Sequence, residues 1–249
     1  MSEVLTETRE GVLRLTLSRP AKKNAVTRAM YTQLTEGLTR AASDDSVRAI
    51  VIAAEGSDFC AGNDIFDFAR DFPAQQARPV EDLAVFRFLR ALTFFSKPLL
   101  AAVQGQAVGV GVTLLLHCDL VVAADDIRLS LPFLKLGLVP EAGSTLLLPQ
   151  RLGHARAFAW MALGEVVGAE AARELGVVNR AVPGAELEAA VMDMAATVAR
   201  WSPAALRHTK ALMRDPEALW RVVLAEGEIF RRLLTSPEAM AAFTAFMRK

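Results

Sequence analysis

The chain has 249 residues, enough for one large domain or for one core with a small appendage. It carries 28 basic and 28 acidic residues, so its formal net charge is zero, and over half of its residues are apolar. This composition excludes a disordered chain, which needs low hydrophobicity and high charge, and it argues against a nucleic-acid binder, which usually has a basic excess. The high apolar share requires a deep core, a subunit interface or an apolar ligand.

The first half of the chain is predicted to alternate strands with helices. Apolar residues at Leu13, Leu15 and Leu17 alternate with polar ones and indicate a half-buried strand. Thr27 is a candidate cap for the helix that follows. Residues 70–80 contain two prolines and little periodicity, which is typical of a loop. The further elements expected here are strands at 47–54, 99–103, 119–124 and 128–130 and a helix at about 80–95.

A long uncharged run lies between Lys97 and Asp119, and its length would suffice to span a bilayer. Pro98 opens the run, and two glutamines and three glycines interrupt it. We therefore predict a buried strand, a turn and a buried helix from about Gly109 instead of a membrane span. The sequence begins without the basic start and apolar run of a secretory signal, so a cytoplasmic protein with no membrane partner is expected.

From Gly143 onward the pattern is almost entirely helical, with one short strand candidate at 177–181. Three prolines stand near expected helix starts, where the missing N–H costs little. They are Pro203, Pro216 and Pro237. The C-terminal helices have many apolar residues, which favours packing against the same chain or another subunit.

Several catalytic motifs are missing from the sequence. It contains no P-loop, no GxSxG elbow and no HExxH motif, and its three histidines are scattered. Cys60 and Cys118 are far apart and fit no zinc spacing, so they are interpreted as buried thiols. Neither a metal site nor a nucleophilic serine is predicted.

Three segments, taken together and in order, carry a specific resemblance. They are Ser57–Ile65, Lys97–Leu120 and Leu131–Thr145, and they resemble the crotonase (enoyl-CoA hydratase/isomerase) superfamily. The resemblance implies an α/β fold, a crotonase-like spiral of repeated β-β-α units with a C-terminal helical region. It also implies a spiral core at 1–183, a helical trimerisation region at 184–249, and a homo-oligomer that is a trimer or a hexamer.

The resemblance implies chemistry on acyl-CoA thioesters. An enolate at the thioester carbonyl needs donors where negative charge develops, and the resemblance assigns this role to the backbone N–H groups of Asn63 and Val110. Many family members have glycine in place of Val110, and its side chain is expected to narrow the acyl pocket. Coenzyme A is part of the substrate, so no separate cofactor is expected. The residues expected beside it are Lys22, Ala25, Ala61, Asn63, Asp64, Ile65 and Phe66.

The acid and base residues distinguish the reactions of this family. Hydratases use two glutamates, whose positions here are occupied by Thr113 and Phe133. Neither side chain can act as a general base, so hydration by the usual route is disfavoured. The Pro-Glu pair at Glu141 instead resembles the Δ3,Δ2-enoyl-CoA isomerase branch, in which one glutamate carries a proton from C2 to C4. Apolar neighbours that include Phe133 and Leu138 predict a substrate pocket and a raised pKa for Glu141.

Other interpretations remain open at this point. Glu141 could be an exposed acid near a helix N-terminus, where the helix dipole stabilises it. Ser144 and Thr145 are predicted to be helix caps, and Asp64 is predicted to cap the helix that follows it. Other crotonase-type chemistry, related to hydration or cleavage, and a non-catalytic acyl-CoA-binding role are the alternatives to an isomerase.

Overall fold

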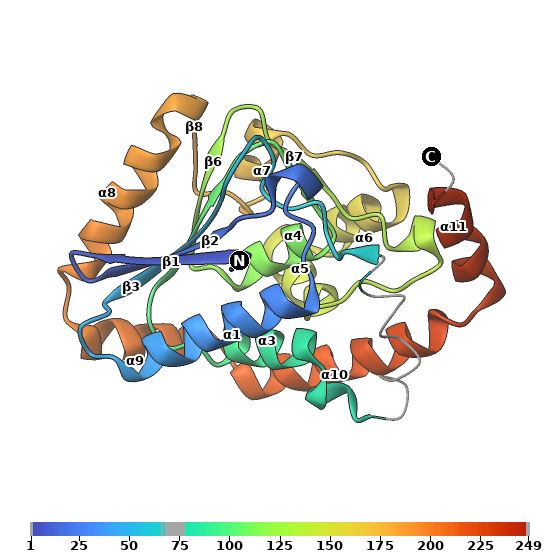
Figure 1. Cartoon of the computed structure of the whole chain (residues 1–249), viewed down its shortest axis with the longest axis horizontal. Coiled ribbons are helices and arrows are strands. Elements are labelled where there is room, and N and C mark those ends of the chain that lie inside the picture. Colours follow the sequence, from blue (N-terminus) through green and yellow to red (C-terminus); the bar gives the residue numbers. More distant parts are fainter. Residues whose placement is uncertain (1, 66, 68–77, 248–249) are drawn as a thin grey trace.

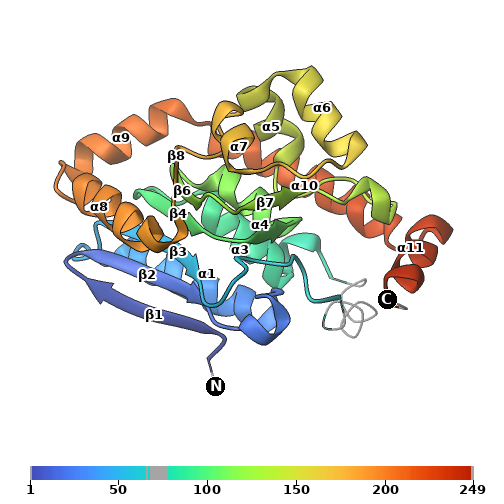
Figure 2. The ribbon, with the colours of Figure 1, turned by 90° about the horizontal axis from the view of Figure 1, so that it is seen from above.

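The computed structural model describes residues 2–65, 67 and 78–247 of the chain. Figures 1 and 2 show a twisted sheet with helices packed against it and further helices at one end. Phe66 and residues 70–77 of the expected loop lie outside the described residues.

The main sheet has six strands in the order β1-β2-β3-β4-β6-β8. Strands β1 and β2 form an antiparallel pair, and every later pairing is parallel. The strands are β1 (Val4–Arg9), β2 (Val12–Leu17), β3 (Ala49–Ala54), β4 (Leu99–Val103), β6 (Leu120–Ala124) and β8 (Arg180–Val182). Each parallel crossover passes through helical segments, as parallel pairing requires.

A second, narrow ladder runs beside the main sheet. Its centre is the parallel pair of β5 (Gln106–Val108) and β7 (Arg128–Ser130). Isolated bridges extend the ladder from Cys60 to Ala107 and from Leu129 to Val167, and another bridge joins Val26 to Asn63. Successive turns of the chain thus give one strand to the wide sheet and one short segment to the narrow ladder. This is the spiral of β-β-α units that the sequence predicts.

The helices cover the sheet and extend beyond it. Helix α8 packs against β3, β4 and β6, whereas α1 packs against β1, β2 and α3. The described helices are α1 (Arg28–Ser43), α3 (Ala84–Thr93), α4 (Val110–Thr113), α5 (Ser144–Leu152), α6 (His154–Leu163), α7 (Ala169–Glu174), α8 (Leu187–Ala199), α9 (Pro203–Met213), α10 (Pro216–Leu233) and α11 (Pro237–Met247). Short 3-10 turns include η2 (Val80–Asp82) and η3 (Leu114–His117).

The C-terminal helices begin where the prolines predict. Pro203, Pro216 and Pro237 are the first residues of α9, α10 and α11. Helix α10 packs against α3, η2 and α5 of the same chain, and Figure 1 shows it below α1, alongside α3. The division of the chain at residue 183 and the trimerisation role of 184–249 stay predictions.

Most sequence-based elements are confirmed, with informative differences. The strands at 99–103 and 128–130 and the cap of α1 are confirmed, since the Thr27 hydroxyl accepts a bond from the Met30 amide. Strand β2 was expected to be half-buried, and this is wrong because nearly all of its side chains are buried. It lies between β1 and β3 and under α1 and α8, so both of its faces are covered.

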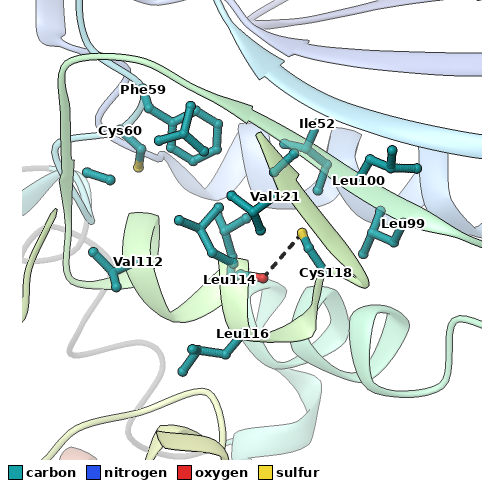
Figure 3. Packing of buried hydrophobic residues seen from close by; sticks show 14 of the residues in the cluster. Ile52, Phe59, Cys60, Leu99, Leu100, Val112, Leu114, Leu116, Cys118 and Val121 are labelled. Carbon is teal, nitrogen blue, oxygen red and sulfur yellow. Dashed lines mark hydrogen bonds between the residues drawn. The ribbon is translucent and has the colours of Figure 1, made fainter. Parts of the chain in front are cut away.

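The uncharged run forms part of the main hydrophobic core. Figure 3 shows Leu99, Leu100, Leu114 and Val121 near Cys118, with Val112 and Leu116 farther away in the same cluster. The Cys118 thiol donates to the Leu114 carbonyl at 3.7 Å, and burial raises the pKa of both thiols, Cys60 and Cys118, to about 12. Both cysteines are therefore the inert buried thiols that the sequence predicts. Among the described helices, none is long and apolar enough to cross a membrane.

Candidate active site

Two segments that the resemblance places beside coenzyme A lie side by side. The Val26 amide donates to the Gly62 carbonyl at 2.8 Å, and the Asp64 amide donates to the Val26 carbonyl at 3.0 Å. The Ala61 amide donates to the Lys23 carbonyl at 2.9 Å. These bonds join the loop that carries Lys22 and Ala25 to the segment 61–65. The fold therefore brings the predicted binding residues together although they are far apart in sequence.

The two predicted oxyanion donors lie on neighbouring segments. The Cys60 amide donates to the Gln106 carbonyl at 3.0 Å, and the Val108 amide donates to the Cys60 carbonyl at 2.9 Å. Helix α4 then begins at Val110, so its first amide has no partner within the helix. Across the described ranges, no acceptor is found for the amide of Asn63 or of Val110. Both N–H groups thus lack an acceptor among the described residues, as the predicted role requires, and their donation to a ligand stays a prediction.

A cavity opens between α1, α3 and α10, and its lining includes both Asn63 and Glu141. Most of the remaining wall is apolar. It includes Tyr31, Leu89, Phe230 and Leu234. Charged side chains also line it, namely Arg28, Asp64, Asp67 and Arg231. A carboxyl group in the wall of a mostly apolar cavity is suited to proton transfer on an apolar ligand, because a ligand that fills the cavity displaces water.

Glu141 is 8% exposed and has one hydrogen-bond donor in the described chain, the Thr113 hydroxyl, at 2.6 Å from Oε1. Burial raises the pKa of Glu141 to about 7; the Thr113 hydrogen bond opposes the rise and the charge of Glu226 adds to it. The expected raised pKa is thus confirmed, and an exposed Glu141 is excluded. A carboxyl group with a pKa near neutrality can both accept and return a proton.

The turn after Glu141 has an unusual backbone. Ala142 and Gly143 adopt left-handed conformations, with φ of 62° and 73°. A Cβ on Gly143 would lie 2.4 Å from the Leu219 Cδ1 of α10, so only glycine fits against this helix. The turn ends at Ser144, where α5 begins.

The N-terminus of α5 is capped from another helix, and the predicted capping role of Ser144 and Thr145 is wrong. No side chain of α5 caps its own helix. The Glu226 carboxylate of α10 instead accepts bonds from the Gly143 amide at 2.6 Å, the Thr145 amide at 2.9 Å and the Thr145 hydroxyl at 2.5 Å. A carboxylate offers two acceptor oxygens at the positive end of the helix, more than a hydroxyl offers.

Glu226 was not predicted from the sequence, although the sequence contains a signal for it. The buried side of α10 consists of Leu219, Val223, Glu226 and Gly227, which recur at helical spacing. An acidic residue within an apolar stripe needs buried partners, since an unpaired buried charge is costly. The pattern could have singled out Glu226, but it could not have named Gly143 and Thr145 as its partners.

Tyr31 is a second missed residue. Its hydroxyl donates to Asn63 Oδ1 at 2.5 Å, and its ring packs against Phe88 with centroids 5.5 Å apart. Burial raises the pKa of Tyr31 well above its usual value, and the charge of Glu141 adds to the rise. The phenol therefore stays a neutral donor that fixes the Asn63 side chain in the cavity wall.

The other predicted residues around coenzyme A have defined places. Lys22 is exposed, whereas Ala25, Ala61 and Ile65 are partly buried. Asp64 Oδ1 accepts from the Asp67 amide at 3.0 Å, which confirms the predicted cap, and Asp64 Oδ2 accepts from Arg19 at 2.9 Å. Phe66 lies outside the described residues, and contact of this group with coenzyme A stays a prediction.

The predicted substrate-pocket residues lie close behind the cavity. In the part of the chain that the structure describes, Thr113, Phe133, Leu138 and Val110 are buried but do not line the cavity. Phe133 lies 3.8 Å from where a Cβ of Gly109 would be, and Leu138 packs with Leu234. Thr113 instead contacts Glu141 directly, and the Val110 side chain belongs to the main core. Any narrowing of the pocket by Val110 stays a prediction.

Replacing Thr113 with valine is expected to raise the pKa of Glu141 further. The variant removes the hydrogen bond that stabilises the charged carboxylate, and valine has nearly the same shape. The acidic limb of the pH profile of kcat/KM should move to higher pH by about one unit. Thr113→Ser, which keeps the donor, is the matched control and should show the wild-type limb. An unmoved limb in Thr113→Val would contradict the proton-carrying role of Glu141.

Comparison with known proteins agrees with this arrangement. The family model for enoyl-CoA hydratase/isomerase matches residues 7–249. The 2,3-dehydroadipyl-CoA hydratase of Escherichia coli (strain K12) is 34% identical over 254 residues, covering 100% of this chain and 97% of the relative. Enoyl-CoA delta isomerase 2 of Rattus norvegicus is 32% identical over 249 residues, covering 99% of this chain and 63% of the relative.

A solved structure extends the likeness to the fold. Pseudomonas aeruginosa OdaA superimposes with a TM-score of 0.93 at 43% identity, and the match covers 100% of both chains. The fold and the site therefore define an enzyme of the crotonase class. The chain belongs to the enoyl-CoA hydratase/isomerase family.

Proposed function

We propose that the protein shifts the double bond of an enoyl-CoA thioester from the 3- to the 2-position. The observation that carries the proposal is Glu141, a buried carboxyl group with a pKa near 7 at the apolar cavity. The two positions at which hydratases of the family have glutamates hold Thr113 and Phe133, which cannot activate water. A single proton carrier suits an isomerisation, which neither adds nor removes atoms.

The reaction follows from the arrangement of these groups. The Glu141 carboxylate removes a proton from C2 of the 3-enoyl thioester, and the electron pair moves onto the thioester oxygen. The amides of Asn63 and Val110 donate to this enolate oxygen. The enolate then collapses, the double bond forms between C2 and C3, and the protonated Glu141 returns the proton to C4. The scheme requires no cofactor, since coenzyme A is part of the substrate.

A product assay tests the proposal. The protein is given 3-enoyl- and 2-enoyl-CoA thioesters side by side, and isomerisation and water addition are followed by chromatography. We expect conversion of the 3-enoyl to the 2-enoyl thioester to be the faster process. Faster water addition would favour a hydratase, the activity named for the Escherichia coli relative. Tight thioester binding without any turnover would indicate a non-catalytic binder.

A further inference from the structure

Glu226 is an acidic residue at a buried position, where acidic side chains are rare. It is 5% exposed and lies in the middle of α10, beside Gly227, which lines the cavity. The Phe86 ring of α3 fills the space over Gly227, since a Cβ there would lie 2.2 Å from the ring. Helix α10 is thereby packed closely against α3, and Glu226 is directed towards the turn that follows Glu141.

Glu226 pairs two backbone amides at the end of a strained turn. Its three bonds reach Gly143 and Thr145, at the end of a turn that starts with the left-handed Ala142. A non-glycine residue is rarely found in this conformation and persists only where its surroundings hold it. From the α10 side, the hydrogen bonds of Glu226 hold the end of this turn in place.

His117 holds the same turn from the opposite side. Its Nε2 lies 2.8 Å from the Ala142 carbonyl oxygen, and burial lowers the pKa of His117 to about 3. The imidazole is therefore neutral, and because a carbonyl oxygen can only accept, Nε2 carries the proton and donates it. The turn between Glu141 and α5 is thus fixed at Ala142 by His117 and at Gly143 and Thr145 by Glu226.

We propose that Glu226 is a positioning residue, whose carboxylate clamps residues 143–145 and so fixes where the Glu141 carboxyl group stands in the cavity. The inference rests on the proposed role of Glu141 as proton carrier. A displacement of about 1 Å at a reacting group can cost a hundredfold in rate, so such a clamp acts on kcat. Binding of the thioester itself does not depend on the clamp.

The clamp also acts on Glu141 through its charge. Negative charge on Glu226 raises the pKa of Glu141, and burial raises the pKa of Glu226 itself to about 7. Thr113 and Thr145 donate to the two carboxyl groups and oppose these shifts. The other titratable groups around the pair are Tyr31 and His117, which are neutral, and Arg28, Asp64, Asp67 and Arg231 in the cavity wall.

Two variants separate the effect of the length of the Glu226 side chain from the effect of its charge. Glu226→Asp keeps the charge but is too short to hold both Gly143 and Thr145. Glu226→Gln keeps the length but removes the charge, and it presents an amide N–H₂ to one of the donors. We expect either variant to lower kcat at least tenfold, with KM for the thioester changed less than threefold. Glu217→Gln, an exposed acid in the first turn of α10, is the matched control and should leave kcat unchanged.

A titration readout keeps the test independent of turnover. Carboxyl ¹³C NMR of protein labelled at glutamate gives the pKa of Glu141, whose signal is assigned by its loss in Glu141→Gln. We expect the Glu141 titration to move to lower pH in Glu226→Gln and to stay in place in Glu217→Gln. A lower melting temperature in both Glu226 variants, with unchanged kcat per folded molecule and an unmoved Glu141 titration, would overturn the proposal.

The same data distinguish failure of this inference from failure of the proposed function. The Glu141 titration could move in Glu226→Gln while the wild-type protein isomerises no 3-enoyl thioester. That result would confirm the electrostatic coupling between Glu226 and Glu141 and refute the isomerase assignment. The wild-type protein could instead isomerise the thioester while neither kcat nor the Glu141 titration responds to either Glu226 variant. That result would support the isomerase assignment and refute the positioning role of Glu226. Should Glu226→Asp fail to fold, Glu226→Gln alone decides both points.

Discussion

Replacing Glu141 with glutamine should lower kcat for the double-bond shift about a thousandfold, within the range that general acid–base catalysis contributes. Glutamine has the size of glutamate and can still accept the Thr113 hydrogen bond, so the cavity keeps its shape. It cannot remove a proton from C2 or return one to C4. Steady-state kinetics with a 3-enoyl-CoA thioester measure the loss. Thioester binding, followed by calorimetry, should change little, and full activity in this variant would refute the assignment.

The same variant should be more stable than the wild-type protein above neutral pH. The pKa of Glu141 is about 7 in the folded chain and 4.5 for an unperturbed glutamate. Between these values the folded chain binds a proton that the unfolded chain has lost, so the free energy of unfolding falls as the pH rises. Above pH 7 the wild-type protein holds a buried charge that glutamine avoids. At pH 8 we expect a gain of about 2 kcal/mol in urea unfolding.

Replacing Gly111 with alanine should disrupt the predicted oxyanion hole. A Cβ on Gly111 would lie 2.8 Å from the Cys60 carbonyl oxygen and 2.9 Å from the Cys60 Cβ. These atoms belong to the backbone and to a short side chain, so they cannot swing aside. Helix α4 must therefore move away from segment 60–63, which separates the Val110 amide from the Asn63 amide. We expect kcat to fall about a hundredfold, the cost of losing one well-placed oxyanion donor.

The control for Gly111→Ala is alanine at a glycine that has space around it. Gly184 has no atom within 4 Å of its would-be Cβ and does not have a left-handed backbone, so Gly184→Ala should keep wild-type kcat. Gly111→Ala should also lose about 2 kcal/mol of stability through overpacking. Unchanged kcat in Gly111→Ala, together with this loss of stability, would show that the two amides do not stabilise the enolate.

The buried strands and the helix starts could be predicted because their causes are local. The apolar run at Leu99–Val103 has no polar face, and it forms the central strand β4 that this pattern indicates. Pro216 begins α10 because its ring suits a first turn and lacks an N–H that would go unpaired. The exposed, mostly polar strand β1 (Val4–Arg9) was not predicted, because pairing with β2 on only one side, and not a buried face, places it in the sheet.

The candidate site could be predicted only where a motif carries it. Asn63 and Glu141 were found through the family resemblance, and the structure places both in the wall of one cavity. Tyr31 and Glu226 have no motif, because their roles arise from contacts between elements far apart in the chain. The predicted caps Ser144 and Thr145 show the same limit, since a local rule cannot foresee a carboxylate supplied by another helix.

The cavity wall that α10 supplies has a consequence for how the protein folds. Gly227, Phe230 and Leu234 face Ala84 and Leu89, which precede them by more than half of the chain. Contacts between such distant residues require closure of a long loop and tend to form late. A nascent chain can therefore assemble its sheet and still lack this cavity. We therefore expect the cavity between α3 and α10 to be completed late in folding, after the sheet has formed.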